Sequence, residues 1–264
     1  MKVAIFIDGT KSQLILPALA RAWKLRDFLA LVPIDCAAYI SYETKIDTSM
    51  EAYKRNQVLE AIAITLGEGP SPSEVVKTAV KRLLDIDRHF KRSPRSNDPE
   101  QANYAFFSSD APGSGVEVLF SPYEAFALLL GVDLLNHRWT QGTAVKILRQ
   151  ARPLLEPKHA EILSWNPEEL FNWEKVAERA RPGDLAVATT RPVSLAICSR
   201  LGRPVDHASD ETREVAVLEN GELMPFIRRE AGISSTVIEL TRLAHRLQSA
   251  LAETTPSKRG RGSA

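Results

Sequence analysis

Basic side chains gather between His137 and Lys158, and their chemistry suits phosphate recognition. This segment holds a single acid, Glu156, and five cations: Arg138, Lys146, Arg149, Arg152 and Lys158. The whole chain has a formal net charge of only +1, so the basic character of this segment is local. Guanidinium and ammonium groups bind phosphates, and arginine or glutamine side chains also read base edges. We therefore expect Arg138, Gln141, Lys146 and Arg149 to bind nucleic acid.

Two short helices would present this surface. The apolar pattern predicts one helix over residues 122–136 and a second over residues 141–152, with Thr140 as the N-cap of the second. The joint, residues 137–140, is as short as a helix-turn-helix requires, although the usual glycine is missing. The pair is therefore a candidate helix-turn-helix that contacts duplex DNA.

The second helix of this pair is expected to carry the DNA contacts. With a turn of about 100° per residue, Lys146 and Arg149 point away from its apolar stripe and toward solvent. The alternative interpretation is an ordinary helical hairpin with a solvated polar face, because lysine and arginine are common on any exposed helix.

A basic tail supplements this surface. Thr236 and Glu239 predict the start of a last helix whose leucine stripe packs on the protein's own core. Residues 254–264 contain no large apolar side chain and are expected to be disordered. Lys258, Arg259 and Arg261 in this tail are expected to add phosphate contacts that do not depend on base sequence.

The N-terminal segment offers a second kind of chemistry. Val3-Ala4-Ile5-Phe6-Ile7-Asp8-Gly9 is an apolar strand that ends in a carboxylate and a glycine. An acid at the carboxyl end of a buried parallel strand lies where α/β folds hold ligands or Mg²⁺. This stretch resembles the first motif of the PIN and NYN nuclease families, in which several acids gather metal ions to activate water for phosphodiester cleavage. The competing interpretation of Asp8 is a turn or cap residue.

A later acid extends the resemblance. Asp110 follows Ala105-Phe106-Phe107-Ser108-Ser109 and resembles a later acidic strand-end motif of the same nucleases. The resemblance implies a Mg²⁺-dependent nuclease with Asp8 and Asp110 as ligands and with Glu43 or Asp47 as a further one. Mg²⁺ belongs to this alternative alone, and the leading interpretation requires no cofactor.

Other common chemistries lack their motifs. Cys36 and Cys198 show no CxxC pattern, and the five histidines have no i, i+4 pair, so neither zinc nor a disulfide framework is predicted. The glycine patterns of dinucleotide-binding folds, P-loops and nucleophile elbows are also missing.

Helix starts are the clearest local signals. A capping residue, a proline and a glutamate recur at Ser71-Pro72-Ser73-Glu74, Ser121-Pro122-Tyr123-Glu124 and Asn166-Pro167-Glu168-Glu169. Residues 48–51 form a further capping box whose helix should end near Leu66, before Gly67. Asp98-Pro99 is ambiguous between a helix start and a turn before a strand.

Short apolar segments predict strands at residues 3–7, 37–42, 104–107, 116–120, 185–189 and 215–218. Asn220-Gly221 predicts a hairpin that returns through residues 223–227, at an edge because of Pro225. About half of the chain is expected in helices and about a sixth in strands. We therefore expect an α+β fold, predominantly helical, with one or two small sheets.

A turn-rich stretch suggests the domain organisation. We predict an N-terminal α/β region at residues 1–95, a linker-like segment at 96–115, a mainly helical domain at 116–253 and the basic tail at 254–264.

The composition bounds the class of protein. With 44% hydrophobic and 25% charged residues, the chain is neither disordered throughout nor collagen-like. No apolar run reaches the roughly 18 residues of a membrane-spanning helix.

We expect a cytoplasmic, regulatory DNA-binding protein rather than an enzyme. A cyclic homodimer would suit DNA reading, because two symmetric half-sites match it. A helical adaptor that binds another protein is the third hypothesis, and a broad exposed apolar patch would be its sign.

Overall fold

The structure is a computed structural model, and it divides into two compact units, residues 1–48 and 49–264. It describes the backbone of residues 3–7 and 10–14 and, in the second unit, residues 52–109, 118–179, 188–199, 213–219, 221–229 and 234–256. The described part of the predicted linker, residues 96–109, belongs to the second unit.

The first unit contains an antiparallel strand pair. Strand β1 (Val3–Ile7) lies beside β2 (Thr10–Leu14), with Ile7 opposite Thr10. The predicted strand at residues 3–7 is confirmed, but its expected place in a parallel sheet is wrong for the residues that are described. A connection of two residues permits only an antiparallel partner, because a parallel one needs a crossover of a dozen residues or more.

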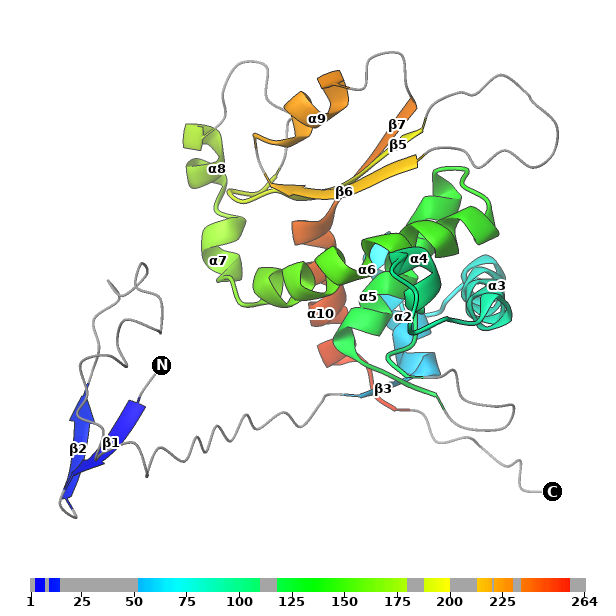
Figure 1. Ribbon diagram of the computed structural model, residues 1–264. Coiled ribbons are helices and arrows are strands. Elements are labelled where there is room, and N and C mark those ends of the chain that lie inside the picture. Colours follow the sequence, from blue (N-terminus) through cyan, green and yellow to red (C-terminus); the bar gives the residue numbers. More distant parts are fainter. Residues whose placement is uncertain are drawn as a thin grey trace, which may run out of the picture. The chain divides into compact units, whose positions relative to one another are not determined.

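The second unit is predominantly helical with small antiparallel sheets, which confirms the expected α+β class (Figure 1). Its described helices are α2 (Arg55–Leu66), α3 (Glu74–Phe90), α4 (Pro99–Ala102), α5 (Pro122–Asn136), α6 (Gln141–Leu163), α7 (Pro167–Leu170), α8 (Trp173–Arg179), α9 (Leu223–Arg229) and α10 (Leu240–Glu253). Its described strands are β3 (Tyr53–Lys54), β4 (Leu119–Phe120), β5 (Val193–Ser199), β6 (Arg213–Glu219) and β7 (Ser234–Glu239).

Local capping chemistry fixes several helix ends. At α5, Ser121 Oγ accepts from the Glu124 amide, and the Glu124 carboxylate accepts from the Ser121 amide, which is the predicted capping box. Gly67 ends α2 with a φ of 86°, a left-handed conformation that glycine adopts without strain. Asp98 caps α4, which resolves the ambiguous Asp98-Pro99 in favour of a helix start.

Other helix ends differ from the sequence pattern. Helix α2 begins at Arg55, after β3, and not at residues 48–51. Helix α3 has Ser73 as its N-cap in place of Ser71. The last helix, α10, begins at Leu240 because the preceding residues pair as β7. Helix α6 continues beyond Arg152 despite two internal prolines, since buried residues of its second half keep it packed against the core.

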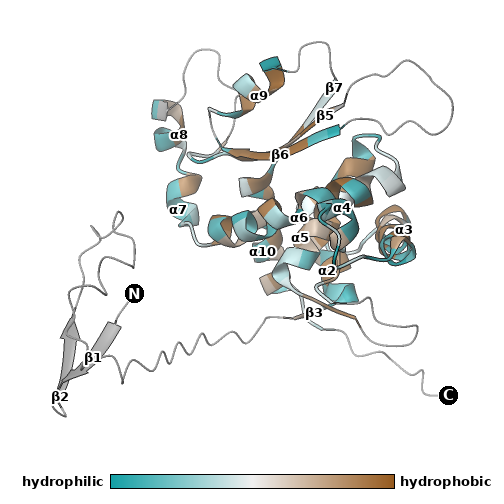
Figure 2. Ribbon diagram, in the orientation of Figure 1, coloured by the Kyte–Doolittle hydropathy of each residue, from teal (hydrophilic) through white to brown (hydrophobic). Residues whose placement is uncertain are grey.

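The three-stranded sheet has the order β6-β5-β7 and separates two apolar clusters. Val193, Leu195 and Ile197 of β5 join the main helical core, while Ala196 and Cys198 face a smaller cluster under α9. This alternation is the period of two expected for a strand covered on both faces. Figure 2 shows long hydrophobic stretches in β6 and mixed colouring in α9.

Residues 223–227 form part of α9, so the predicted return strand is wrong. Leu223, Phe226 and Ile227 have helical i, i+3, i+4 spacing and pack on the outer face of the sheet. Pro225 lies in the first turn of α9, where its missing amide has no helical partner to lose.

Helix α6 is the centre of the second unit. It contacts α3, α4, α5, α10 and β6, and the main apolar core surrounds it. Within the described residues, the structure contains no helix with the length and apolar character needed to cross a bilayer.

Candidate nucleic-acid interface

The structure places Arg138 and Gln141 at the joint between α5 and α6. Arg138 is exposed, has a left-handed φ of 68° and forms no ion pair with any residue that the structure describes. Gln141 is half-buried at the first position of α6 and lines a hollow of about 620 Å³ between α3 and the end of α5. Trp139 fixes the joint, because its indole Nε1 donates to Thr236 Oγ1 of β7 at 3.1 Å.

Lys146 is half-buried and partly neutralised. Its Nζ lies 3.5 Å from Glu100 Oε1, and the other oxygen of the same carboxylate lies 3.7 Å from Arg213 Nη2. Glu100 therefore serves two cations that come from different elements, α6 and β6. Among the described residues, these two cations share this one carboxylate.

Arg149 is buried, so the prediction that it faces open solvent is wrong. The residue is 2% exposed, and its Nε donates to Asp87 Oδ1 at 2.7 Å. Nη1 donates to the Lys91 carbonyl at 2.6 Å, and Nη2 donates to the Asp87 carbonyl at 2.6 Å. Nη1 also lies 3.5 Å from the Glu100 carbonyl, so four of the five N–H groups have partners inside the protein. This buried guanidinium braces the end of α3 against α6 and is not presented to a base edge.

The same geometry removes the open face that a recognition helix needs. Helix α4 packs against α6 on the side of Lys146 and Arg149, and α3 covers the adjoining side. A recognition helix must expose one side along its length to enter the major groove. Helices α5 and α6 and the Thr140 cap exist as predicted, but their packing is that of an internal helix pair.

Arg152 and Lys158 of the basic segment also bind to other groups of the protein. Arg152 Nη1 donates to the carbonyls of Tyr104 and Phe107 at 2.8 and 2.6 Å. Lys158 Nζ lies 2.7 Å from carboxylates of both Glu161 and Glu219. Hydrogen bonds to these two acids raise the pKa of Lys158. The charge count along the sequence therefore overstates the cations that remain available.

The remaining predicted residues lie outside the described residues. These are Lys258, Arg259 and Arg261 of the tail, and Asp8, Glu43, Asp47 and Asp110 of the nuclease alternative. Among the residues that are described, no three His, Cys, Asp or Glu side chains come together as a metal site.

A different set of cations surrounds a concavity between α3, α4 and α6, here called the basic hollow. It has a volume of about 410 Å³. Its lining consists of Phe90, Lys91, Arg92, Ser93, Glu100, Gln101, Lys146 and Arg149. Among these described lining residues, Lys91, Arg92, Lys146 and Arg149 are cationic and Glu100 is the one acid, but Arg149 is already paired with the buried Asp87. Lys91 is exposed and has no ion pair to a described residue.

Aromatic rings and guanidinium groups alternate at the wall of the basic hollow. The Arg149 guanidinium carbon lies 5.7 Å from the ring centroid of Phe90 and 5.2 Å from that of Tyr104. The guanidinium carbon of Arg92 lies 5.4 Å from the Tyr104 ring. Tyr104 is buried, whereas Phe90 is 40% exposed. Phe90 is therefore the exposed aromatic member of this stack.

The buried Asp87 carboxylate holds Arg149, the central member of this stack, in place. Asp87 is 0% exposed, and its Oδ2 accepts from the amides of Ala105 and Phe106 at 3.0 Å each. Burial raises the pKa of the Asp87 carboxyl, while Arg149 and the two amides act in the opposite direction. This network fixes the position of Arg149 and, through the Lys91 carbonyl, the end of α3.

Lys91 has an unusual backbone. Its φ of 50° and ψ of −177° fall in a region that glycine occupies almost alone. Such a conformation costs a non-glycine residue on the order of 1–3 kcal/mol. The hydrogen bond from Arg149 to its carbonyl and one from its own amide to Arg88 hold it there.

The signal for this hollow was present in the sequence. Residues 88–95 contain Arg88, Lys91, Arg92 and Arg95 with no acid, and Phe90 stands among them. The predicted domain organisation placed this stretch at the end of the N-terminal region, residues 1–95, and not in a binding site. A basic run with an aromatic residue also fits a nucleic-acid contact.

The comparisons with known proteins identify no relative. No family model matches the chain, and no curated protein or solved structure matches it significantly. The fold and the basic hollow are therefore the basis for any functional proposal.

Proposed function

We propose that this chain is a nucleic-acid-binding protein that holds phosphate groups in the basic hollow. The observation that carries the proposal is the gathering of Lys91, Arg92 and Lys146 around one concavity in which Glu100 is the one acid among the described lining residues. Lysine and arginine contacts to phosphates supply most of the affinity in sequence-independent binding. A regulatory role in the cytoplasm and a cyclic homodimer remain parts of this proposal.

The backbone of Lys91 supports a functional role for its side chain. A strained lysine persists where the surrounding structure holds it, and such residues cluster at functional sites. Glycine would satisfy the same φ and ψ without strain, yet the position carries an exposed ammonium group at the rim of the hollow.

The two other hypotheses receive less support from the described residues. Exposed large apolar side chains are Val75, Phe90, Leu119, Leu154 and Trp173. They are distributed over α3, β4, α6 and α8, whereas an adaptor surface would gather them into one broad patch. The nuclease alternative depends on Asp8 and Asp110, which lie outside the described residues, and it stays a prediction.

The test is a salt titration of DNA binding with single substitutions at the rim. Lys91→Gly and Lys146→Ala should each weaken binding, and each should reduce the slope of log affinity against log salt by about 0.7–0.9 if one phosphate contact is lost. Binding can be followed by fluorescence anisotropy of a labelled oligonucleotide. Arg149 is unsuitable for this test because its removal would disturb the fold.

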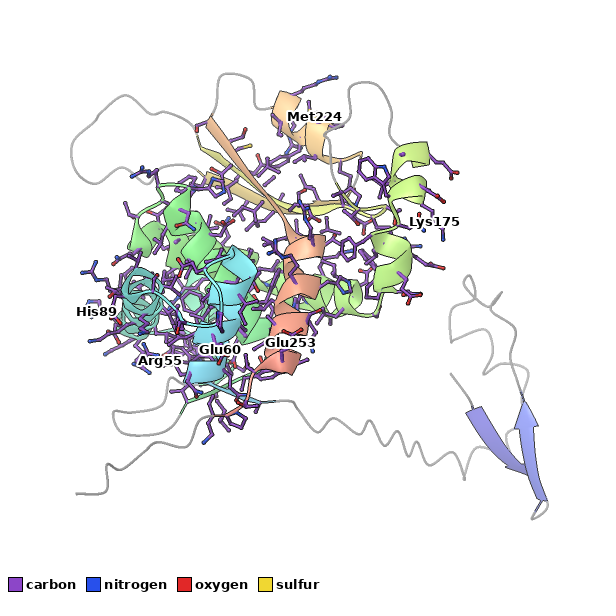
Figure 3. All side chains as sticks on the ribbon, turned by 180° about the vertical axis from the view of Figure 1, so that it is seen from behind. Arg55, Glu60, His89, Lys175, Met224 and Glu253 are labelled. Atoms are coloured by element: carbon purple, nitrogen blue, oxygen red, sulfur yellow. The ribbon has the colours of Figure 1, made fainter. Side chains whose placement is uncertain are left out.

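Lys175→Ala is the matched control. Lys175 is exposed on α8, and Figure 3 shows it on the opposite side of the second unit from His89 at the end of α3. Its loss should leave affinity and salt slope unchanged. Equal effects of Lys91→Gly, Lys146→Ala and Lys175→Ala would mean that binding depends on overall charge and would remove the basic hollow as the site.

Lys91→Gly also separates function from stability. Removing the strain of about 1–3 kcal/mol outweighs the extra chain entropy of glycine, about 0.5–1 kcal/mol. The free energy of unfolding should therefore stay equal or rise while DNA affinity falls. A fall in both would indicate that Lys91 supports the fold and not a ligand.

A further inference from the structure

The exposed end of the aromatic and guanidinium stack lies inside the basic hollow. One side of the Phe90 ring faces the Arg149 guanidinium, and the ring tip approaches Gly142 of α6. A Cβ on Gly142 would lie 3.6 Å from Phe90 Cζ, which is ordinary contact distance. The ring is thus supported by α6, and 40% of the residue remains accessible to a ligand.

The concave shape of the basic hollow suits a single strand better than double-stranded DNA. Base edges of B-form DNA are read by a convex element that enters a groove, and α6 is covered where such contacts were expected. A concave site with cations and an exposed aromatic ring suits a strand whose bases are unpaired, because a paired base is stacked between its neighbours and cannot reach a ring at the wall of a hollow.

We propose that the basic hollow binds single-stranded nucleic acid, with one unpaired base stacked on Phe90 and the adjacent phosphates beside Lys91 and Lys146. The proposal rests on the proposed function and names its substrate class. The ligand base then adds one more ring to the stack of Tyr104, Arg149 and Phe90. Arg149 acts as a positioning residue, since it contacts Phe90 and holds the Lys91 carbonyl.

Electrostatics alone would give the opposite preference. A duplex has a higher charge density than a single strand and releases more counterions for each phosphate contact. A purely cationic hollow should therefore favour the duplex. Preference for the single strand requires stacking, which is worth about 1–3 kcal/mol per base, or a factor of about 5 to 150 in affinity.

The experiment compares three probes with the full chain: a single-stranded deoxythymidine oligonucleotide, a blunt duplex of the same length, and an abasic strand with the same number of phosphates. The single strand should bind about tenfold or more tightly than either of the other two. Phe90→Leu keeps an apolar side chain but lacks a π-face. It should lower affinity for the single strand about tenfold and change affinity for the duplex and the abasic strand less than twofold.

The outcomes separate this inference from the proposed function. If the duplex binds as well as the single strand, or if Phe90→Leu changes nothing, the stacking site is overturned, while losses in Lys91→Gly and Lys146→Ala would still support phosphate binding in the hollow. If the wild-type protein binds none of the three probes, both proposals fail. Should Phe90→Leu fold poorly, the comparison of normal and abasic strands with the wild-type protein decides the question alone.

Discussion

Replacing Arg149 with alanine should destabilise the protein strongly, because the change leaves the Asp87 carboxylate buried without its counter-charge. Asp87 is 0% exposed and Arg149 2% exposed, and their closest atoms are 2.7 Å apart. Removing one partner of a buried ion pair typically costs about 3–5 kcal/mol. The carbonyls of Lys91 and Asp87 would lose donors as well.

The expected loss is a large share of the total stability. A domain is typically stable by about 5–15 kcal/mol, so a loss of about 4 kcal/mol would remove between a quarter and most of it. An exposed arginine behaves differently, since surface substitutions usually change stability by less than about 0.5 kcal/mol. Arg138, exposed and without an ion pair among the described residues, provides the matched control.

Urea denaturation followed by tryptophan fluorescence and circular dichroism measures the difference. Arg149→Ala should lower the free energy of unfolding by about 3–5 kcal/mol and Arg138→Ala by less than about 0.5 kcal/mol. The double variant Asp87→Leu with Arg149→Met should cost less than the sum of its single variants, because it removes both charges together. Equal, small losses for Arg149→Ala and Arg138→Ala would refute the internal brace and restore Arg149 as a surface cation.

Two further predictions test the packing around α6 and α10. Thr241 is fully buried, and its Oγ1 accepts from the Val193 amide at 3.1 Å and donates to the Arg191 carbonyl at 2.9 Å. Thr241→Val removes both hydrogen bonds and should lower the free energy of unfolding in denaturant by about 1–3 kcal/mol. Thr241→Ser keeps the hydroxyl and should retain most of the stability. Burial, together with a smaller effect of His245, lowers the pKa of His159 from 6.5 to about 4. The unfolded chain therefore binds more protons between these values, and stability falls on acidification through that window by about 3 kcal/mol. His159→Phe should remove this part of the pH dependence and His137→Gln, at an exposed site, should not; parallel stability profiles for wild type and His159→Phe would contradict the assignment.

Local sequence patterns predicted the elements whose ends are closed by neighbouring residues. The cap of α5 at Ser121, its bounds Pro122–Asn136 and the Thr140 cap of α6 all follow from hydrogen bonds within a few residues. Strand β6 also overlaps its predicted range. These features depend on interactions that a short window of sequence contains.

Local sequence patterns could not predict which strands pair with each other. Strand β5 pairs with β6 and with β7, so Val193 lies opposite Glu219 and Ser194 lies opposite Glu239, beyond the reach of a short sequence window. Residues 223–227 suit a strand by composition, but α9 forms because Phe226 and Ile227 pack on Ala196 and Cys198 of β5. The partner that decides between the two structures is supplied by a distant segment.

The candidate site likewise combines features that the sequence predicts with features that only the packing of helices decides. The sequence alone determined that basic side chains gather near residues 88–95 and 137–158, since charge is a property of residue type. Only the tertiary structure decided which of them face a ligand, because α3 and α4 pack over α6 and bring the Asp87 carboxylate to Arg149. An arginine on the polar side of a predicted helix becomes an internal brace when another helix supplies a buried acid, and no helical period carries that information.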